Sequence, residues 1–405
     1  MHIPVTRPAG AALASALLLS LTACGEADTS AETEAPSSER ESTSTAQQRV
    51  VVASDAGVVV VDADTLETLD SFATPSRPKL QLAGDDRHVF TLASDAGSVG
   101  VVDAGAWSEA HGDHSHHYVV APSELETTFD RGTSYHAVSD DERSVVWFDD
   151  DASFVSFDTK ELEDDEVDAK IVETGGAHHG VAAPLANGGW LASVAEGDHA
   201  IGVKVLDADG ATTKTIEDCH GLHGETHVGD DYAFGCEDGV LTVDPAGEAS
   251  KIVSPLEGAG TGALYPGEGE ILVGDLRGDD APEAAATSLA LYDTAAGTAR
   301  VVDLGVEFST VTRYEDQAFA LGTDGALHVV DVTTGEVVDS IPVTDAWEKD
   351  EDWKVPTPQV AQAEGVAYVT DPSDSTITSW DLTSGAERGE AKLKDVPTSL
   401  LVTNG

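Results

Sequence analysis

Histidines gather in four places along this chain, and their chemistry is the first clue to its function. They lie in the segment 111–117, at position 136, at positions 178–179, and between positions 220 and 227. A neutral imidazole is a ligand of borderline softness that suits zinc and copper. Soft sulfur ligands are scarce, because the 405 residues include one methionine and three cysteines. The sequence therefore predicts a transition-metal site built on histidine, with zinc as the first expectation. The alternative is a set of solvated surface histidines.

The elements that must position these histidines have the pattern of short strands. After residue 48, runs rich in Val, Ala, Leu and Thr are broken by Asp-Gly and Thr-Gly turns. A strand that closes with Asp before a turn recurs, as at 58–62, 327–331 and 377–381. The pattern repeats about every 35 to 45 residues, which is typical of propeller blades. We predict an all-β chain that forms a single β-propeller, with eight blades as the count and seven as the alternative.

The ends of the folded region are expected to meet in one blade. The first repeat unit begins near Val50 and shows only three strands. The C-terminal run 398–402 can supply the missing inner strand. N-terminal and C-terminal strands would then share a blade, which removes exposed sheet edges.

Three of the histidine positions are equivalent when the repeat units are aligned on their first hairpin turn. Counting back one strand reaches His136, then His178 or His179, and then His223. The matching positions of four other units are apolar: Leu80, Ala263, Val311 and Val360. The innermost strands of a propeller begin close to its axis on one face, so three imidazoles there can converge on one ion. Adjacent residues point to opposite sides of a strand, so we expect only one of His178 and His179 to bind it.

A fourth ligand can be water, a carboxylate or another histidine. Glu225 and His227 alternate with His223 along the same strand, and His220 lies just before it, so these three residues are further candidates.

Two cysteines flank this region. Cys219 and Cys236 form an even pair in a chain that we expect outside the cytoplasm, which favours a disulfide. Zinc thiolates are the alternative, but the spacing differs from that of paired C-x-x-C knuckles. A disulfide here would fix the loop that carries His220 and His223.

The segment 111–117 has a different character, because Gly and Ser make it polar and mobile. It sits between the third strand of the second unit and a strand near 118–121. His114 and His116 are two apart and can face one ion, with His111 or Asp113 assisting. Together with His117 they form a histidine-rich tract that suits capture or hand-over of a metal better than tight storage.

The N-terminal segment indicates export. Arg7 and the apolar stretch 9–21 give residues 1–23 the pattern of a signal peptide, too short to span a bilayer permanently. The segment 21–24 (Leu-Thr-Ala-Cys) resembles a lipobox, so we expect lipidation of Cys24. Residues 24–48 are rich in Ser, Thr and Glu and are expected to form a disordered tether. The folded domain, 49–405, would then lie on the outer face of the cell membrane or in the periplasm, attached only through its lipid.

Charge narrows the choice of partners. The chain carries 75 acidic and 21 basic residues, a formal net charge of −54. Such a surface repels a phosphate backbone, so nucleic-acid binding is not expected. The acid is spread along the whole length, and solvation in a salty medium explains it as well as a specific partner does.

Several of these motifs together resemble one family. The internal histidine tract, the His-His-Gly-Val segment at 178–181, the Cys-His-Gly-Leu-His-Gly-Glu segment at 219–225 and the Phe-Gly-Cys-Glu-Asp-Gly segment at 234–239 are similar to those of the AztD-type zinc metallochaperones. The resemblance implies that the central histidines hold zinc tightly and that the tract aids transfer. It also implies a partner, the solute-binding protein of a zinc ABC transporter. This chain departs from the family in its apparent lipid anchor.

Two other classes of function stay open from the sequence. A propeller can be an interaction scaffold without any metal, and fold alone does not exclude this. A metal-dependent, lactonase-like enzyme would carry a similar histidine set around a catalytic zinc. The chain has no nucleophile elbow, and Glu225 is the one nearby candidate for a general base. Histidine ligands also leave copper and nickel open as alternatives to zinc.

Overall fold

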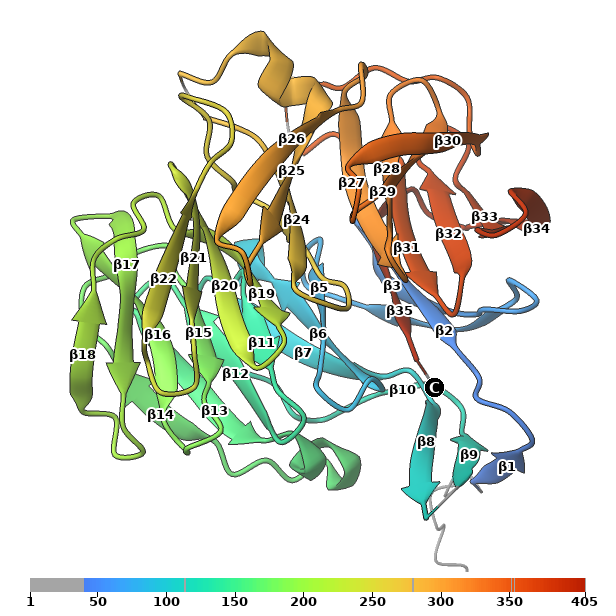
Figure 1. Cartoon of the computed structure of the whole chain (residues 1–405). Coiled ribbons are helices and arrows are strands. Elements are labelled where there is room, and N and C mark those ends of the chain that lie inside the picture. Colours follow the sequence, from blue (N-terminus) through green and yellow to red (C-terminus); the bar gives the residue numbers. More distant parts are fainter. Residues whose placement is uncertain (1–39, 113, 279, 351, 353, 405) are drawn as a thin grey trace, which may run out of the picture. The chain divides into compact units, whose positions relative to one another are not determined.

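The chain folds as a β-propeller of four-stranded antiparallel sheets (Figure 1). The computed structural model describes residues 40–404 except 113, 279, 351 and 353. The described residues contain eight such sheets, in step with the eight repeat units counted in the sequence. The expected signal peptide, Cys24 and most of the expected tether lie outside the described residues. Within the described part, no helix has the length and apolarity needed to cross a membrane.

The sheets follow one another in chain order, and each runs from an innermost strand at the axis to an outermost strand. In that strand order, the first four sheets are β35 (Pro397–Thr403), β2 (Arg49–Ser54), β3 (Gly57–Asp62) and β4 (Thr68–Ala73); β5 (Lys79–Leu82), β6 (His88–Ala93), β7 (Ser98–Asp103) and β10 (Ser123–Glu124); β11 (Ala137–Ser139), β12 (Arg143–Phe148), β13 (Ser153–Asp158) and β14 (Lys170–Glu173); and β15 (Ala182–Pro184), β16 (Trp190–Glu196), β17 (His199–Leu206) and β18 (Thr212–Ile216).

The other four sheets have the same arrangement. They are β19 (His223–Val228), β20 (Asp231–Cys236), β21 (Gly239–Val243) and β22 (Ala249–Val253); β23 (Leu264–Tyr265), β24 (Ile271–Asp275), β25 (Ser288–Asp293) and β26 (Thr298–Asp303); β27 (Phe308–Tyr314), β28 (Gln317–Gly322), β29 (Ala326–Asp331) and β30 (Glu336–Pro342); and β31 (Gln359–Ala363), β32 (Val366–Asp371), β33 (Thr376–Asp381) and β34 (Ala386–Lys392). Three short 3-10 helices, η1 (Ser94–Ala96), η2 (Thr159–Asp164) and η3 (Glu283–Thr287), lie between strands.

The two ends of the folded region share a sheet, as the sequence predicted. The C-terminal strand β35 pairs with β2 from Arg49 opposite Thr403 to Ser54 opposite Pro397. The innermost strands then pack around the axis, with β35 contacting β5 on one side and β31 on the other. This packing brings the starts of the innermost strands close together, which is the condition for a shared site.

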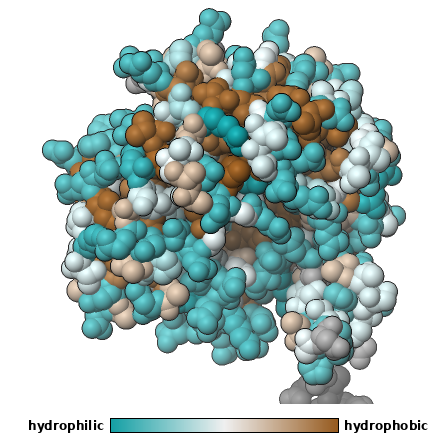
Figure 2. Space-filling model, in the orientation of Figure 1, coloured by the Kyte–Doolittle hydropathy of each residue, from teal (hydrophilic) through white to brown (hydrophobic). Residues whose placement is uncertain are grey.

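Apolar layers between neighbouring sheets hold the ring. The middle strands carry the largest buried side chains, among them Trp147, Phe90 and Tyr292. Phe90 of β6 meets Phe157 of β13 edge to face at 6.2 Å, so adjacent blades interlock through aromatic rings. Hydrophilic residues cover most of the face shown in Figure 2, in keeping with the acidic composition.

The recurring Asp at strand ends has a structural role. The Asp331 carboxylate accepts a hydrogen bond from the Thr334 backbone N–H at 2.8 Å. Asp381 receives the Ser384 N–H and hydroxyl at 2.8 and 2.7 Å. Each carboxylate closes the turn that leads to the outermost strand. Part of the acidic excess therefore stabilises turns and needs no partner to explain it.

A separate three-stranded sheet is inserted between β7 and β10. It has the order β1-β9-β8, with β1 (Glu41–Thr43), β8 (Ala106–His111) and β9 (His114–Val119) (Figure 1). The expected mobile tract 111–117 is thus largely a β-hairpin, because consecutive residues of β8 and β9 pair from Ala106 opposite Val119 to His111 opposite His114.

The strand β1 differs from the expectation of a disordered tether up to residue 48. Pairing with β9 gives its backbone groups partners, and the Arg40 guanidinium lies 3.3 Å from the Tyr118 ring centroid and bonds Glu109 at 3.0 Å. Segments with little to bury can still be ordered when a neighbouring strand offers an open edge.

Candidate metal centre

Three histidines meet at the starts of three consecutive innermost strands. His136 directly precedes β11, His179 lies three residues before β15, and His223 is the first residue of β19. Their ring centroids are 5.1 Å apart for His136–His179, 5.5 Å for His179–His223 and 6.0 Å for His136–His223. We call these three residues the central trio. The alignment of repeat units predicted this set, apart from the choice between the two adjacent histidines.

Each imidazole of the central trio is held from behind through Nδ1. The partner of His136 is the Glu225 carboxylate at 3.0 Å, that of His179 is the Asp149 carboxylate at 2.9 Å, and that of His223 is the Gly262 carbonyl at 2.8 Å. All three partners are acceptors, so each Nδ1 carries a hydrogen, and a ring without a second proton offers the lone pair of its Nε2. This is the tautomer that binds a metal through Nε2, with the orienting hydrogen bond on the opposite nitrogen.

The spacing of two Nε2 atoms suits one ion. His136 Nε2 and His179 Nε2 are 3.4 Å apart. Two nitrogens bound to one tetrahedral zinc at its usual bond length are about 3.3–3.4 Å apart. When neither Nε2 carries a proton, the two lone pairs face each other and can share one cation. These two donors therefore fit one zinc ion. No ring nitrogen of His223 lies within 4.8 Å of both, so this ring has to shift to become the third ligand.

The side chains of the site differ in how far they are exposed to solvent and in the charges around them. The side chains of His136 and Glu225 are only 6% and 9% exposed, whereas that of His179 is 40% exposed. The trio is thus closed behind His136 and open to solvent at His179. Burial, with the nearby Arg277 cation, lowers the pKa of His223 to about 4, so this ring is neutral at physiological pH.

Glu225 acts behind the trio, on the far side of a ring from the metal position. Burial tends to raise its pKa, but the neighbouring His136 and Lys79 outweigh this and leave the pKa below its ordinary value. Its Oε1 receives His136 Nδ1, while its buried Oε2 has no hydrogen-bond partner among the described residues. Bonded at Nδ1, this carboxylate orients the His136 ring.

A β-bulge changes the side-chain alternation between His223 and Glu225, so the Glu225 carboxylate contacts His136 Nδ1. The pairing of β19 with β20 shifts between His223 and Glu225, and Gly224 between them has φ +64°. A Cβ on Gly224 would lie 2.6 Å from the Gly262 carbonyl oxygen, the atom that receives His223 Nδ1. Glycine is therefore required both for the backbone turn and for the close approach of this carbonyl.

The structure separates the two adjacent histidines. His178 is buried away from the trio, with Nδ1 on the Gly176 carbonyl at 2.7 Å and Nε2 on the Ser193 hydroxyl at 2.9 Å. Its ring also packs on Trp147 at 5.2 Å. Both nitrogens are occupied, so the geometry favours His179 as the ligand and His178 as a core residue.

Two further candidates lie outside the trio. His227 is exposed and packs on the Tyr232 ring at 4.1 Å. His220 is also exposed, in the loop before β19. That loop is fixed by the Cys219–Cys236 disulfide, whose S–S distance is 1.99 Å, as the sequence predicted.

Sequence reasoning missed the residues that orient the trio. Asp149 follows the last residue of β12, and Gly262 contributes only a backbone carbonyl. Nothing distinguishes Asp149 among 75 acidic residues, and a carbonyl has no residue signature.

A second set of imidazoles lies on the hairpin of β8 and β9. One ligand atom from each of His111, His114 and His116 falls within 4.8 Å of the others, and all three side chains are exposed. We call these residues the hairpin cluster. His117 points to the other face of β9 and bonds the Ser108 hydroxyl at 2.7 Å, as strand alternation requires. Asp113 lies outside the described residues.

Comparisons of sequence and of structure both find similarity to the zinc chaperone AztD. No family model matches the chain. The zinc chaperone AztD of Citrobacter koseri is 27% identical over 362 residues, which cover 86% of this chain and 84% of the relative. A crystal structure of Citrobacter koseri AztD matches with a TM-score of 0.82 and 25% identity, covering 89% of this chain and 99% of that one.

More distant matches show the fold alone. The apo AztD structure of the same organism has a TM-score of 0.80 at 24% identity, covering 88% of this chain and 98% of that one. Dihydro-heme d1 dehydrogenase NirN has a TM-score of 0.58 at 13% identity, covering 89% and 75%. The sequence and structural comparisons with AztD together confirm the resemblance to the AztD-type zinc chaperones that the sequence motifs predicted.

Proposed function

We propose that this chain is an extracytoplasmic zinc metallochaperone, which holds one zinc ion through His136, His179 and His223. The observation that carries the proposal is that three rings from consecutive blades have centroids 5.1–6.0 Å apart, each with its Nδ1–H on an acceptor, and that His136 Nε2 and His179 Nε2 are 3.4 Å apart. The name of the AztD relative, a zinc chaperone, supports zinc over copper or nickel. The proposal assigns no catalysis, and the fourth position is left for water or a ligand from the receiving protein.

We propose that zinc leaves through the solvent-exposed side of the central trio. His179 is 40% exposed, so it is the ligand that an incoming partner can displace first. We propose the solute-binding protein of a zinc ABC transporter as the receiver and the hairpin cluster as an auxiliary relay. Exposed imidazoles hold zinc weakly, because water and protons compete freely for them. A weak, accessible site suits transfer and the partly buried trio suits storage.

The location is part of the same proposal. A disulfide persists in oxidising compartments, and Cys219–Cys236 is such a bond. Residues 1–23 would be the signal peptide, Cys24 the lipidated residue, and the propeller the domain held beside a membrane transporter.

Metal titration tests the proposal. Zinc is titrated into the metal-free chain against a chelator of known affinity, for the parent protein and for His136→Ala, His223→Ala and His227→Ala. We expect one tight zinc in the parent and in the matched control His227→Ala, and a loss of about a hundredfold or more in the other two, beyond the usual cost of removing an orienting residue. Absence of tight zinc in the parent protein would sink the chaperone and leave an interaction scaffold.

A further inference from the structure

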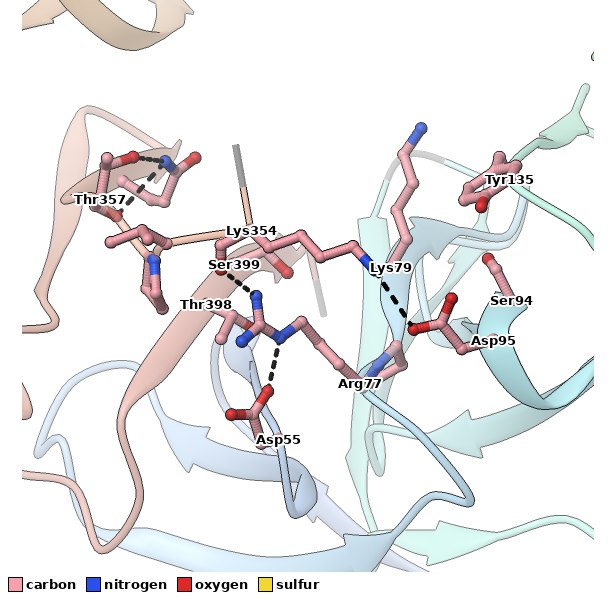
Figure 3. A pocket seen from close by; sticks show the side chains of 14 residues that line it. Asp55, Arg77, Lys79, Ser94, Asp95, Tyr135, Lys354, Thr357, Thr398 and Ser399 are labelled. Atoms are coloured by element: carbon pink, nitrogen blue, oxygen red, sulfur yellow. Dashed lines mark hydrogen bonds and ion pairs between the residues drawn. The ribbon is translucent and has the colours of Figure 1, made fainter. Parts of the chain in front are cut away.

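A cavity of about 480 Å³ opens beside the central trio and has its own chemistry (Figure 3). Its wall includes Lys79 and Gln359, the first residues of β5 and β31, and Thr398 and Ser399 near the start of β35. It is therefore the axial mouth of the propeller, on the face where the innermost strands begin. Tyr135 also lines it, and the Tyr135 ring lies 5.3 Å from that of His179, so cavity and trio share a wall.

Positive charge gathers at this mouth, although the chain as a whole carries −54. Arg77, Lys79 and Lys354 all line it. The Arg77 guanidinium pairs with Asp55 at 2.5 Å, and the Lys354 ammonium is 3.7 Å from Asp95. Lys79 is in excess over these pairs, and within the described residues no hydrogen bond or ion pair joins its ammonium to a neighbour.

The Lys79 ammonium has no directly bonded counter-ion among the described residues. The side chain is exposed, yet the protein atoms crowded around the ammonium lower its pKa, and the more distant Glu225 carboxylate only partly compensates. Figure 3 shows the side chain extending into the cavity beside Tyr135. A cation in a partly dehydrated cavity is stabilised when an anion joins it there.

Hydroxyl groups add to this donor set. Thr398 Oγ1 and Ser399 Oγ are buried, and neither has a hydrogen-bond partner among the described residues. Leaving a buried hydroxyl unpaired is costly, so such groups usually mark an absent partner. One ammonium and two hydroxyls around one cavity are the donors that an oxyanion accepts.

We propose that this mouth binds a small oxyanion, either a carboxylate or an inorganic anion. Its volume lies within the 300–1,000 Å³ or so that is typical of small-molecule sites. Resting on the proposed function, the anion also couples to zinc. Lys79 opposes a dication in the trio next door, and an anion on Lys79 removes that repulsion, so each ligand strengthens binding of the other.

Calorimetric titration of the metal-free chain with succinate and with sulfate, at low ionic strength, tests the site. We expect saturable binding of one equivalent of at least one anion. Lys79→Met should weaken it roughly tenfold. The matched control Lys160→Met removes an exposed lysine of η2 and should bind as the parent does. Thr398→Val, which keeps the side-chain shape, is a second variant should Lys79→Met fold poorly, and it should weaken binding severalfold.

The outcomes separate this inference from the proposed function. No saturable binding of either anion, or equal binding by the parent, Lys79→Met and Thr398→Val, overturns the anion site, whatever zinc does. Anion binding by a chain that takes no zinc supports the site and overturns the chaperone. Where both ligands bind, succinate at fixed free zinc should raise the zinc affinity about threefold or more in the parent and not in Lys79→Met, and an unchanged affinity overturns the coupling.

Discussion

Two sets of three histidines occupy this chain, and they are built differently. In the central trio, every ring has its Nδ1 on a named acceptor, and the rings come from three separate sheets. In the hairpin cluster, the three rings come from one two-stranded hairpin, are exposed, and pack on one another at centroid distances of 4.9–5.6 Å. Residue type is the same in both places, so the difference lies in the scaffold.

We infer from this difference that the central trio stores zinc and that the hairpin cluster transfers it. Carboxylate and carbonyl partners fix the tautomer and orientation of the trio before any ion arrives, so only His223 has to shift on binding. An exposed hairpin must desolvate and order its rings when it binds, which weakens affinity but speeds exchange. Four sets of variants can test this contrast, and they differ in how strongly each should change zinc affinity.

The sharpest test uses the two adjacent histidines. His179→Ala removes a ring from the trio and should lower zinc affinity by about a hundredfold or more, with little change in the free energy of unfolding. His178→Ala should leave zinc binding nearly unchanged but lower the free energy of unfolding by about 1–3 kcal/mol, since it removes one of the two hydrogen-bond partners of the buried Ser193 hydroxyl and the ring packed on Trp147. Zinc competition and urea unfolding measure the two effects. The reverse pattern would show that the wrong histidine was assigned.

The second test weakens an orienting partner without touching a ring. Asp149→Asn keeps the size of the side chain behind His179 but replaces an ionised acceptor by a weaker, neutral one. Loss of such a partner usually costs about 10–100-fold in metal affinity, and we expect a value in that range. Asp164→Asn, an exposed carboxylate of η2, is the matched control and should bind zinc as the parent does. Equal affinities would mean that the trio is not preorganised by its partners.

The third test removes the disulfide that constrains the backbone near the trio. Replacing Cys219 and Cys236 by Ser frees the loop before β19, which carries His223. The free energy of unfolding should fall by about 2–4 kcal/mol. Zinc affinity should fall less than for Asp149→Asn, roughly fivefold, because the Gly262 carbonyl still orients His223. A thiol-reduced parent protein should behave like the variant. An affinity loss as large as that of His179→Ala would place the disulfide at the centre of the site.

Much of this scaffold is readable from the sequence, because its signals are local. Strand patterns that end in Asp before a turn mark each blade, and the missing strand of the first unit predicts the β2–β35 pairing. Register then follows from counting, since blades repeat the same hairpin. This is why the alignment reached His136 and His223, at or beside the starts of their strands, without a structure.

The parts that sequence reasoning left open depend on neighbours far along the chain. His178 and His179 are separated by what each ring meets, Ser193 in one case and Asp149 in the other. The bulge at Gly224 moves Glu225 behind His136, and no alternation rule foresees it. The hairpin of β8 and β9 was expected as a mobile tract, because Gly and Ser around its turn hide the strand pattern that β1 completes.

The smallest expected effect on affinity belongs to the hairpin cluster. Replacing His111, His114 and His116 together by Ala should leave the tight zinc within about twofold of the parent, because the trio and its partners are untouched. The rate of transfer to a purified solute-binding protein should instead fall severalfold, as measured by stopped-flow with a zinc-sensitive dye. His117→Ala, on the other face of β9, is the matched control and should transfer at the parent rate.

Loss of the tight zinc in the triple variant would move storage from the propeller axis to the hairpin. An unchanged transfer rate would leave the trio to exchange zinc directly through its exposed ligand, His179.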